Sequence, residues 1–415
     1  MSILLNEPEP AFSPSDVPPP LPSTPEPSPS ELQLGPGAFP GFLRPFASLW
    51  WGIKSLFGTA TIVAVLAILA AIPGLNILTL GYLVEPQKRV AASGKLRDGF
   101  PLMVFAPRLG IIMFFSLLFL IPLRFMAVRV NDAAVILGAN DPRTLRMMTV
   151  LAIMKWLAGI YLLLAISYGG SFSSFFRPVR NLKWFWKATM TRPGRTELSA
   201  QIETMLDVMK PFHHFWLGLK AFLGAVLWLA IPSGMLVAVT NPERDNPVLG
   251  VVSFLGVLLM IPVMAWLPLL QVHQAVEGRF VSVFSIRTAR AIIARVPLRW
   301  MLATVVLYAL TFPLYLAKIR LLPGDAMLLI TPFFIVLTYP TRLLMAWVYH
   351  QGQQRPASAF FLWRWLIKLV MVPALGAYCF FLFLTPFVSE LGRSAPLENQ
   401  AFLGPVPYAQ WGRSK

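Results

Sequence analysis

Cationic side chains inside long apolar runs are the residues of this sequence whose type and position suit a chemical role. Four of them lie within such runs or close to their ends: Lys155, Lys220, Arg342 and Lys368. A charge inside a bilayer costs several kcal/mol unless it is solvated or paired. No Asp or Glu lies at a comparable depth in these runs, so an anionic ligand could supply the missing countercharge.

These cations divide into two pairs by their depth. Lys220 and Lys368 lie within two turns of the start of their runs, so we favour snorkelling of their ammonium groups to the lipid headgroups. Lys155 and Arg342 lie deepest, and for them snorkelling and a shared internal cavity are equally open. In a shared cavity they would bind an anionic amphiphile or an anionic lipid headgroup. Lys155 and Arg342 are therefore the candidate anion- and lipid-binding residues.

The four histidines do not predict a metal centre. They are His213, His214, His273 and His350. Adjacent residues point in different directions on a helix, so His213 and His214 are not expected to share one ion without help from elsewhere. No carboxylate–histidine spacing of a known metal motif occurs, and we expect interfacial hydrogen bonding. The single cysteine, Cys379, excludes an intramolecular disulfide and a cysteine metal cluster.

Enzymes are the class of protein that the motifs favour least. The chain has no H-E-x-x-H, no G-x-S-x-G and no G-x-x-x-x-G-K-[ST] sequence. Carboxylates are also too few to gather several polar groups at one depth. We therefore expect a non-enzymatic protein without a cofactor.

The elements that position these residues are predicted by composition. Of the 415 residues, 56% are hydrophobic and 13% are charged, whereas soluble domains carry about a quarter charged residues. The net charge of +17 comes from 35 Lys and Arg against 18 Asp and Glu. These cations lie mainly in connections, which favours contact with anionic headgroups and excludes nucleic acid as the expected partner.

Run lengths predict an all-α, polytopic membrane bundle of about eight transmembrane helices. Proline interrupts all but the third of these runs, so many of the helices should be kinked. The predicted spans are Leu56–Val84, Pro107–Val128, Met147–Tyr168, Phe215–Val239, Val248–Leu270, Leu298–Leu316, Ala326–Val348 and Leu362–Val388.

The first run leaves two structures open. It is longer than one crossing and is interrupted by Pro73 and Gly74. Leu56–Val84 is therefore either one long kinked helix or a segment that folds back as a re-entrant element. The connections after the odd-numbered spans carry the larger share of cations, which places them in the cytoplasm. The fold-back alternative would place the N-terminal tail on that same side.

A short internal match raises the hypothesis of two four-helix repeats. Convergent composition is the alternative explanation of so short a match. Gln87, Ala91, Gly94, Lys95 and Leu96 align without a gap to Gln271, Ala275, Gly278, Arg279 and Phe280.

The domain organisation follows from these patterns. Residues 1–45 are a Pro-rich tail that we expect to be disordered, with P-x-x-P sequences that suit protein partners. Residues 46–168 hold an interfacial helix and three spans, and 169–214 form an amphipathic connection rich in cations and aromatic residues. Residues 215–388 hold five spans, and 389–415 are a C-terminal tail.

Two functions from different classes remain open. The first is the binding or transport of an anionic amphiphile or lipid. The second is a non-catalytic scaffold or regulator that docks partners through the Pro-rich tail and the amphipathic connection. A multi-pass protein of the bacterial cytoplasmic (inner) membrane fits both.

Overall fold

The structure, a computed structural model, is built from helices. It describes residues 40–389 and Pro396, except residues 73, 102, 104–105, 168–171, 241–246 and 320–323. This part of the chain forms twelve α-helices and four short 3₁₀-helices, and it has no strand. The Pro-rich tail up to residue 39 and the C-terminal tail, apart from Ser389 and Pro396, lie outside the described residues.

Within the described residues, eight helices are long and apolar enough to cross a membrane, which confirms the predicted polytopic bundle. Six α-helices begin with a proline as their first residue, where the missing N–H has no partner to lose. The spanning helices are α1 (Pro45–Ala71), α3 (Ala106–Leu137), α4 (Pro142–Ser167), α7 (Pro211–Leu236), α8 (Pro247–Glu277), α10 (Pro297–Ile319), α11 (Gly324–Gln354) and α12 (Phe361–Val388).

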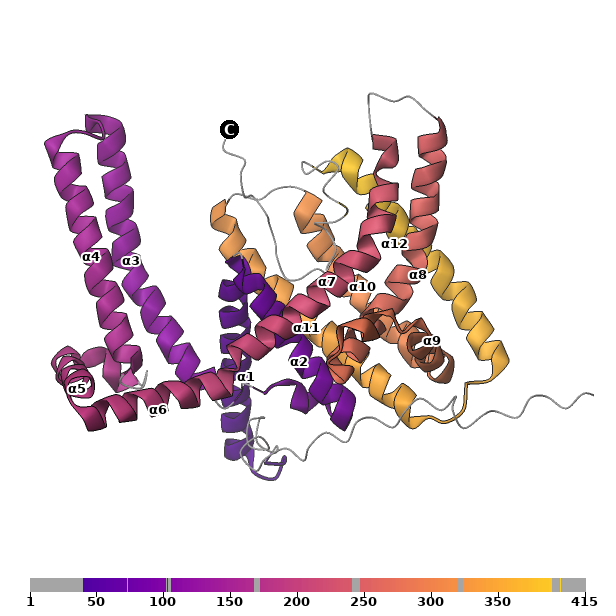
Figure 1. The fold of residues 1–415 in the computed structure, drawn as a ribbon, viewed down its shortest axis with the longest axis horizontal. Helices are drawn as coiled ribbons and strands as arrows, with labels where there is room; N and C mark the ends of the chain where they lie inside the picture. The colour runs from indigo at the N-terminus through magenta and orange to yellow at the C-terminus, as the bar shows by residue number, and fades with distance from the viewer. Residues whose placement is uncertain are drawn as a thin grey trace, which may run out of the picture.

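Shorter helices connect the spans. Figure 1 shows that α3 and α4 form a hairpin at one side of the main bundle, and α3 packs against α1. The helices α5 and α6 lead from the end of this hairpin back to the bundle. The shorter elements are α2 (Leu75–Ser93), α5 (Pro178–Met190), α6 (Arg192–Met209), α9 (Ile286–Arg295), η2 (Leu96–Gly99), η3 (Phe172–Phe176), η4 (Ala238–Thr240) and η5 (Phe280–Phe284).

The first apolar run folds back on itself. α1 and α2 run in opposite directions (Figure 1), and the hydroxyl of Thr79 donates to the carbonyl oxygen of Leu66 at 3.5 Å. Gly74, between the two helices, has φ +81°, a conformation that favours glycine. The fold-back alternative for Leu56–Val84 is therefore the observed one.

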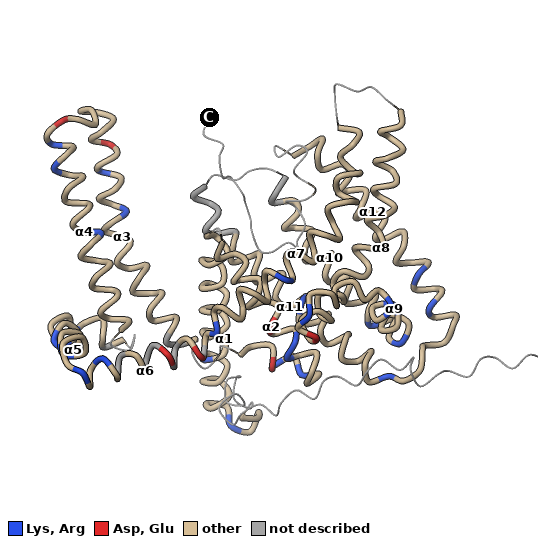
Figure 2. Tube along the Cα trace, in the orientation of Figure 1, with Lys and Arg blue, Asp and Glu red and all other residues tan. Residues whose placement is uncertain are grey.

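Lys and Arg residues are unevenly distributed along the bundle. Many lie toward the end that holds α5, α6 and the start of α12, with a further group on the α3–α4 hairpin (Figure 2). The start of α1 and the end of α2 lie at that same end (Figure 1). The positive-inside rule predicts that this cation-rich end, and with it the start of α1, faces the cytoplasm.

Single-cysteine labelling tests this topology. In a Cys379→Ala background, we expect Ala47→Cys and Ala92→Cys to react with an impermeant maleimide from the same side of sealed vesicles. Ala139→Cys, in the α3–α4 turn, should react only from the other side, because α3 crosses the bilayer between them. Labelling of Ala47→Cys from the same side as Ala139→Cys would contradict the fold-back.

α2 lies at the centre of the bundle and packs against α1, α7, α8 and α11. Its contact with α7 is backbone to backbone. A Cβ on Gly81 would lie 1.7 Å from the carbonyl oxygen of His214, and one on Gly218 would lie 2.0 Å from that of Ile77. Glycine at both positions therefore allows the close approach of the two helices.

Gly81→Ala and Gly218→Ala should each destabilise the folded protein by at least ~3 kcal/mol, because an added methyl would overlap a backbone oxygen. The measurement is the apparent melting temperature of purified protein in detergent. Gly159→Ala is the matched control, since nothing lies within 4 Å of its added Cβ. Equal melting temperatures for all three variants would show that the helices do not touch as described.

The two matching segments share a local backbone. α2 and α8 are each followed by a glycine in the left-handed region, Gly94 at φ +71° and Gly278 at φ +68°, and then by a 3₁₀-helix. The following helix pairs differ, because α10 and α11 both pack within the bundle whereas α3 packs on α1 at its side and α4 packs mainly on α3 and α5 (Figure 1). The local motif thus agrees with the repeat hypothesis, and two four-helix halves remain a prediction.

Candidate functional site

Arg342 lies in the interior of the bundle. It is 6% exposed and is the one Lys or Arg among the buried residues in the described part of the chain. Its Nη1 donates to Oε1 of Gln87 at 3.4 Å, and Nε2 of Gln87 donates back to the carbonyl oxygen of Arg342 at 3.3 Å. Gln87 therefore holds both the guanidinium and the backbone of α11 at this point.

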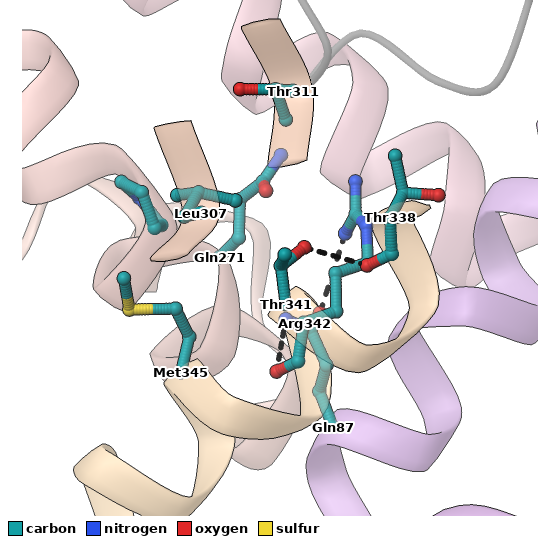
Figure 3. Close-up of a pocket in the computed structure, with 9 residues that line it drawn as sticks. Gln87, Gln271, Leu307, Thr311, Thr338, Thr341, Arg342 and Met345 are labelled. Carbon is teal, nitrogen blue, oxygen red and sulfur yellow. Dashed lines mark hydrogen bonds between the residues drawn. The ribbon is translucent and has the colours of Figure 1, made fainter. Parts of the chain in front are cut away.

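A polar cavity adjoins this arginine. It has a volume of about 20 Å³, close to that of one water molecule. Figure 3 shows the guanidinium of Arg342 near Thr338 and the side chain of Gln271 reaching toward the same space from α8. The lining residues come from α2, α8, α10 and α11; they are Gln87, Pro268, Gln271, Leu307, Thr311, Thr338, Thr341, Arg342 and Met345.

Hydrogen-bond donors in this cavity are concentrated on Arg342 and the glutamines. The hydroxyls of Thr311, Thr338 and Thr341 donate to backbone carbonyl oxygens of their own helices, so their own oxygens remain acceptors. The guanidinium and the amides of Gln87 and Gln271 are the groups with N–H donors. They could bind an anion, whereas the threonine oxygens could accept from water or from Arg342.

No carboxylate forms an ion pair with Arg342 in the described residues. Ion pairs found there include those of Arg89 with Glu85, Arg97 with Asp98 and His213 with Glu85. A buried guanidinium without a carboxylate is expensive in a membrane interior. Arg342 is thus a buried guanidinium without a carboxylate partner among the described residues.

Lys155 lies elsewhere. It is exposed on α4, whose main contacts are with α3 and α5, and it does not line the cavity of Arg342. The structure therefore does not bring the two candidate residues together. Lys368 is exposed near the start of α12, as snorkelling requires, whereas Nζ of Lys220 donates to the carbonyl oxygen of Gly278 at 2.9 Å.

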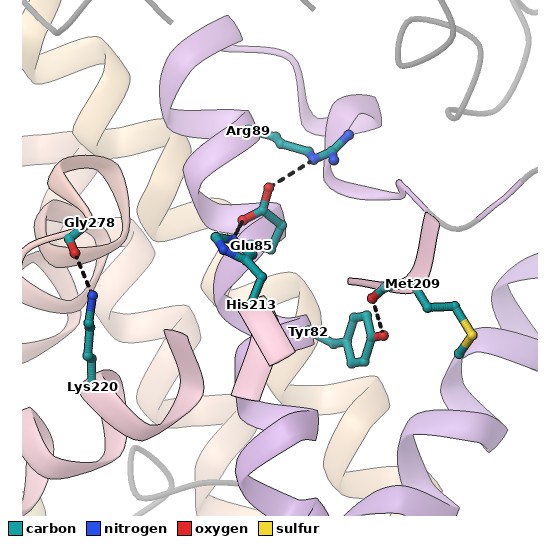
Figure 4. Close-up of polar contacts among 7 residues, drawn as sticks. All are labelled: Tyr82, Glu85, Arg89, Met209, His213, Lys220 and Gly278. Atoms are coloured by element: carbon teal, nitrogen blue, oxygen red, sulfur yellow. Dashed lines mark hydrogen bonds and ion pairs between the residues drawn. The ribbon is translucent and has the colours of Figure 1, made fainter. Parts of the chain in front are cut away.

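A second cluster of polar side chains joins α2 to the start of α7. Oε1 of Glu85 lies 3.4 Å from Nε of Arg89, and Oε2 lies 3.5 Å from Nε2 of His213 (Figure 4). The buried ring of His214 packs on Tyr82, with 4.1 Å between the ring centroids. Sequence reasoning missed this cluster, because Glu85 and the two histidines are far apart in the chain and match no metal motif.

The other two histidines form the hydrogen bonds predicted for them. Nδ1 of His273 lies 2.9 Å from the hydroxyl of Tyr349, and Nδ1 of His350 lies 2.8 Å from the carbonyl oxygen of Ala91. Both therefore tie α8 or α11 to a neighbouring element.

The amphipathic connection before α7 contains two α-helices, α5 and α6. α5 exposes Leu182 and Trp186 beside the cations of its sequence, as an interfacial segment does. An open hollow of about 540 Å³ lies at its start, lined by Phe176, Arg177, Pro178, Val179, Arg180 and Lys183. α6 follows in the same connection, and several of its side chains lie outside the described residues.

Comparison with known proteins found no matching family model, no matching curated protein and no matching solved structure.

Replacing Arg342 should separate a binding role from a structural one. We expect Arg342→Met to leave the protein as stable as the wild type or to stabilise it by about 1–4 kcal/mol, because it removes a buried charge while keeping similar volume. The measurement is the apparent melting temperature in detergent without added anions. A loss of more than ~2 kcal/mol would show that the guanidinium serves the packing of the bundle.

Proposed function

We propose that this protein is a non-enzymatic integral membrane protein that binds and moves an anionic amphiphile or lipid, with Arg342 as the anion-binding residue. The observation that carries the proposal is the buried guanidinium of Arg342, which lies among amide donors and has no carboxylate partner in the described residues. Ionisable side chains in the interior of membrane bundles commonly line substrate or ion pathways.

The chemistry of the site suits a carboxylate, a sulfate or a phosphate group. A guanidinium presents planar, fork-like donors that match two oxygens of such a group. Gln87 and Gln271 add amide N–H groups from two different helices. Because they lie in the two matching segments, a ligand between them would contact both of these segments.

The size of the cavity implies that the helices must separate for a headgroup to enter. A volume of about 20 Å³ holds one water-sized group. Prolines interrupt the helices around it, with Pro268 in α8, Pro313 in α10 and Pro340 in α11. Each proline removes one backbone hydrogen bond from its helix and favours a kink there. Discontinuous helices line the sites of many transporters.

Lys155 is proposed to contact headgroups at the surface of the protein, outside the Arg342 cavity. It is exposed on a span of the α3–α4 hairpin, so its ammonium group would reach lipid headgroups or the passing headgroup of a ligand, outside the Arg342 cavity. The bacterial cytoplasmic membrane is the proposed location, supported by the gathering of cations at one end of the molecule (Figure 2).

A ligand panel tests the proposal. The melting temperature of purified protein is measured with anionic lipids, phosphate, sulfate and carboxylates, for the wild type, Arg342→Met and Lys155→Ala. A ligand at 100 times its dissociation constant should stabilise the wild type by about 2.7 kcal/mol. We expect one ligand class to do so, with the effect kept in Lys155→Ala and lost in Arg342→Met.

Equal stabilisation of the wild type and Arg342→Met would contradict the assignment of Arg342. A panel without any stabilising ligand would favour the second function, a membrane scaffold or regulator. The observation that supports a scaffold is α5, which exposes Leu182 and Trp186 together with cations at the start of the amphipathic connection. Such a surface would dock a partner together with the Pro-rich tail.

A further inference from the structure

We propose that Glu85, His213 and His214 form a binding site for one divalent transition-metal ion of the Zn²⁺ class. One ligand atom from each of the three side chains lies within 4.8 Å of the other two. The proposal does not depend on the function proposed for Arg342. The cavity of Arg342 has a different set of lining residues, which does not include Glu85, His213 or His214.

The close crossing of α2 and α7 brings these residues together. Gly81, one turn before Glu85 on α2, lies against the backbone of His214. On α7, Gly218 lies one turn after His214 and against the backbone of Ile77. The two imidazoles belong to the first turn of α7 and differ in burial, with the side chain of His213 53% exposed and His214 only 7% exposed. Their ring centroids are 5.4 Å apart. The carboxylate of Glu85 is the help from another helix that two adjacent histidines need to share an ion.

Unused polar atoms mark the cluster as a site. Nδ1 of His214 is buried and has no hydrogen-bond partner. Oε2 of Glu85 is buried too, and it makes the 3.5 Å ion-pair contact with His213 without a hydrogen bond of full geometry. Buried polar atoms without partners are costly, and those of native proteins generally have a reason such as an ion.

The set of donors selects the class of ion. Two imidazole nitrogens and one carboxylate oxygen suit Zn²⁺, Co²⁺ and related ions, whereas Mg²⁺ and Ca²⁺ prefer sites made of oxygen atoms. Zn–N and Zn–O distances are about 2.0–2.2 Å, so the ligand atoms would close to about 3.3 Å from one another. Rotation of the Glu85 and His213 side chains would bring the ligand atoms this much closer together. On the exposed side of His213, a water molecule could take the fourth coordination position of the ion.

Arg89 would orient the ligating carboxylate of Glu85 and would not coordinate the ion itself. Its Nε lies 3.4 Å from Oε1 of Glu85, the oxygen that does not face His213. A donor at this place fixes the orientation of a ligating carboxylate, as partners outside the coordination sphere do in known metal sites. The competing explanation is an ordinary ion pair between Glu85 and protonated His213, and metal titration distinguishes the two.

The test is a titration with Co²⁺ of the full-length protein, purified without a polyhistidine tag, at neutral pH. We expect saturation at one ion per chain, with the visible absorption of a tetrahedral Co²⁺ site, and displacement by Zn²⁺ but not by excess Mg²⁺. Glu85→Gln, His213→Ala and His214→Gln should each weaken Co²⁺ binding at least tenfold. His273→Gln is the matched control and should bind as the wild type does, because His273 pairs with Tyr349 outside the cluster.

Two results would overturn the proposal. One is the absence of saturable Co²⁺ binding by the wild type. The other is binding that His213→Ala keeps at wild-type strength, and this variant decides the matter if His214→Gln does not fold, because His213 is half-exposed. Arg342→Met should bind Co²⁺ normally, so a failure of the anion site and a failure of the metal site are told apart.

Discussion

The backbones of α2 and α7 touch at Gly81 and Gly218, and the rest of the bundle depends on this contact. It holds α2 in the centre, where the helix also packs against α1, α8 and α11. Residues two apart on a helix point in nearly opposite directions. α2 can therefore turn Gln87 toward Arg342 on α11 while Glu85 meets the histidines of α7.

Burying the charge of Arg342 costs free energy, and no carboxylate among the described residues offsets this cost with an ion pair. A hydrophobic side chain of the same volume would fill this position at lower cost. The amides of Gln87 and Gln271 reach the same cavity from helices that belong to the two matching segments. The proposed binding role would explain why a charge is kept at this position and why both matching segments carry a glutamine.

The sequence predicted the helical, polytopic class and the eight spans, because the length of an apolar run is a local property. It could not decide the fold of Leu56–Val84, since Pro73 and Gly74 permit both a kink and a reversal. It also expected Lys155 and Arg342 to be equivalent by depth, whereas depth along a helix says nothing about which face is buried. The contact of Glu85 with His213 is tertiary, and no spacing in the chain could have revealed it.

The most direct test of the central claim is an experimental structure of the protein with the anion that stabilises it. The account predicts density for the anionic group within about 3 Å of the Arg342 guanidinium. It also predicts contacts with Gln87 and Gln271, and wider separation of α2, α8 and α11 around them. An anion bound only at the surface, for instance in the hollow at the start of α5, with the Arg342 cavity still closed, would contradict it.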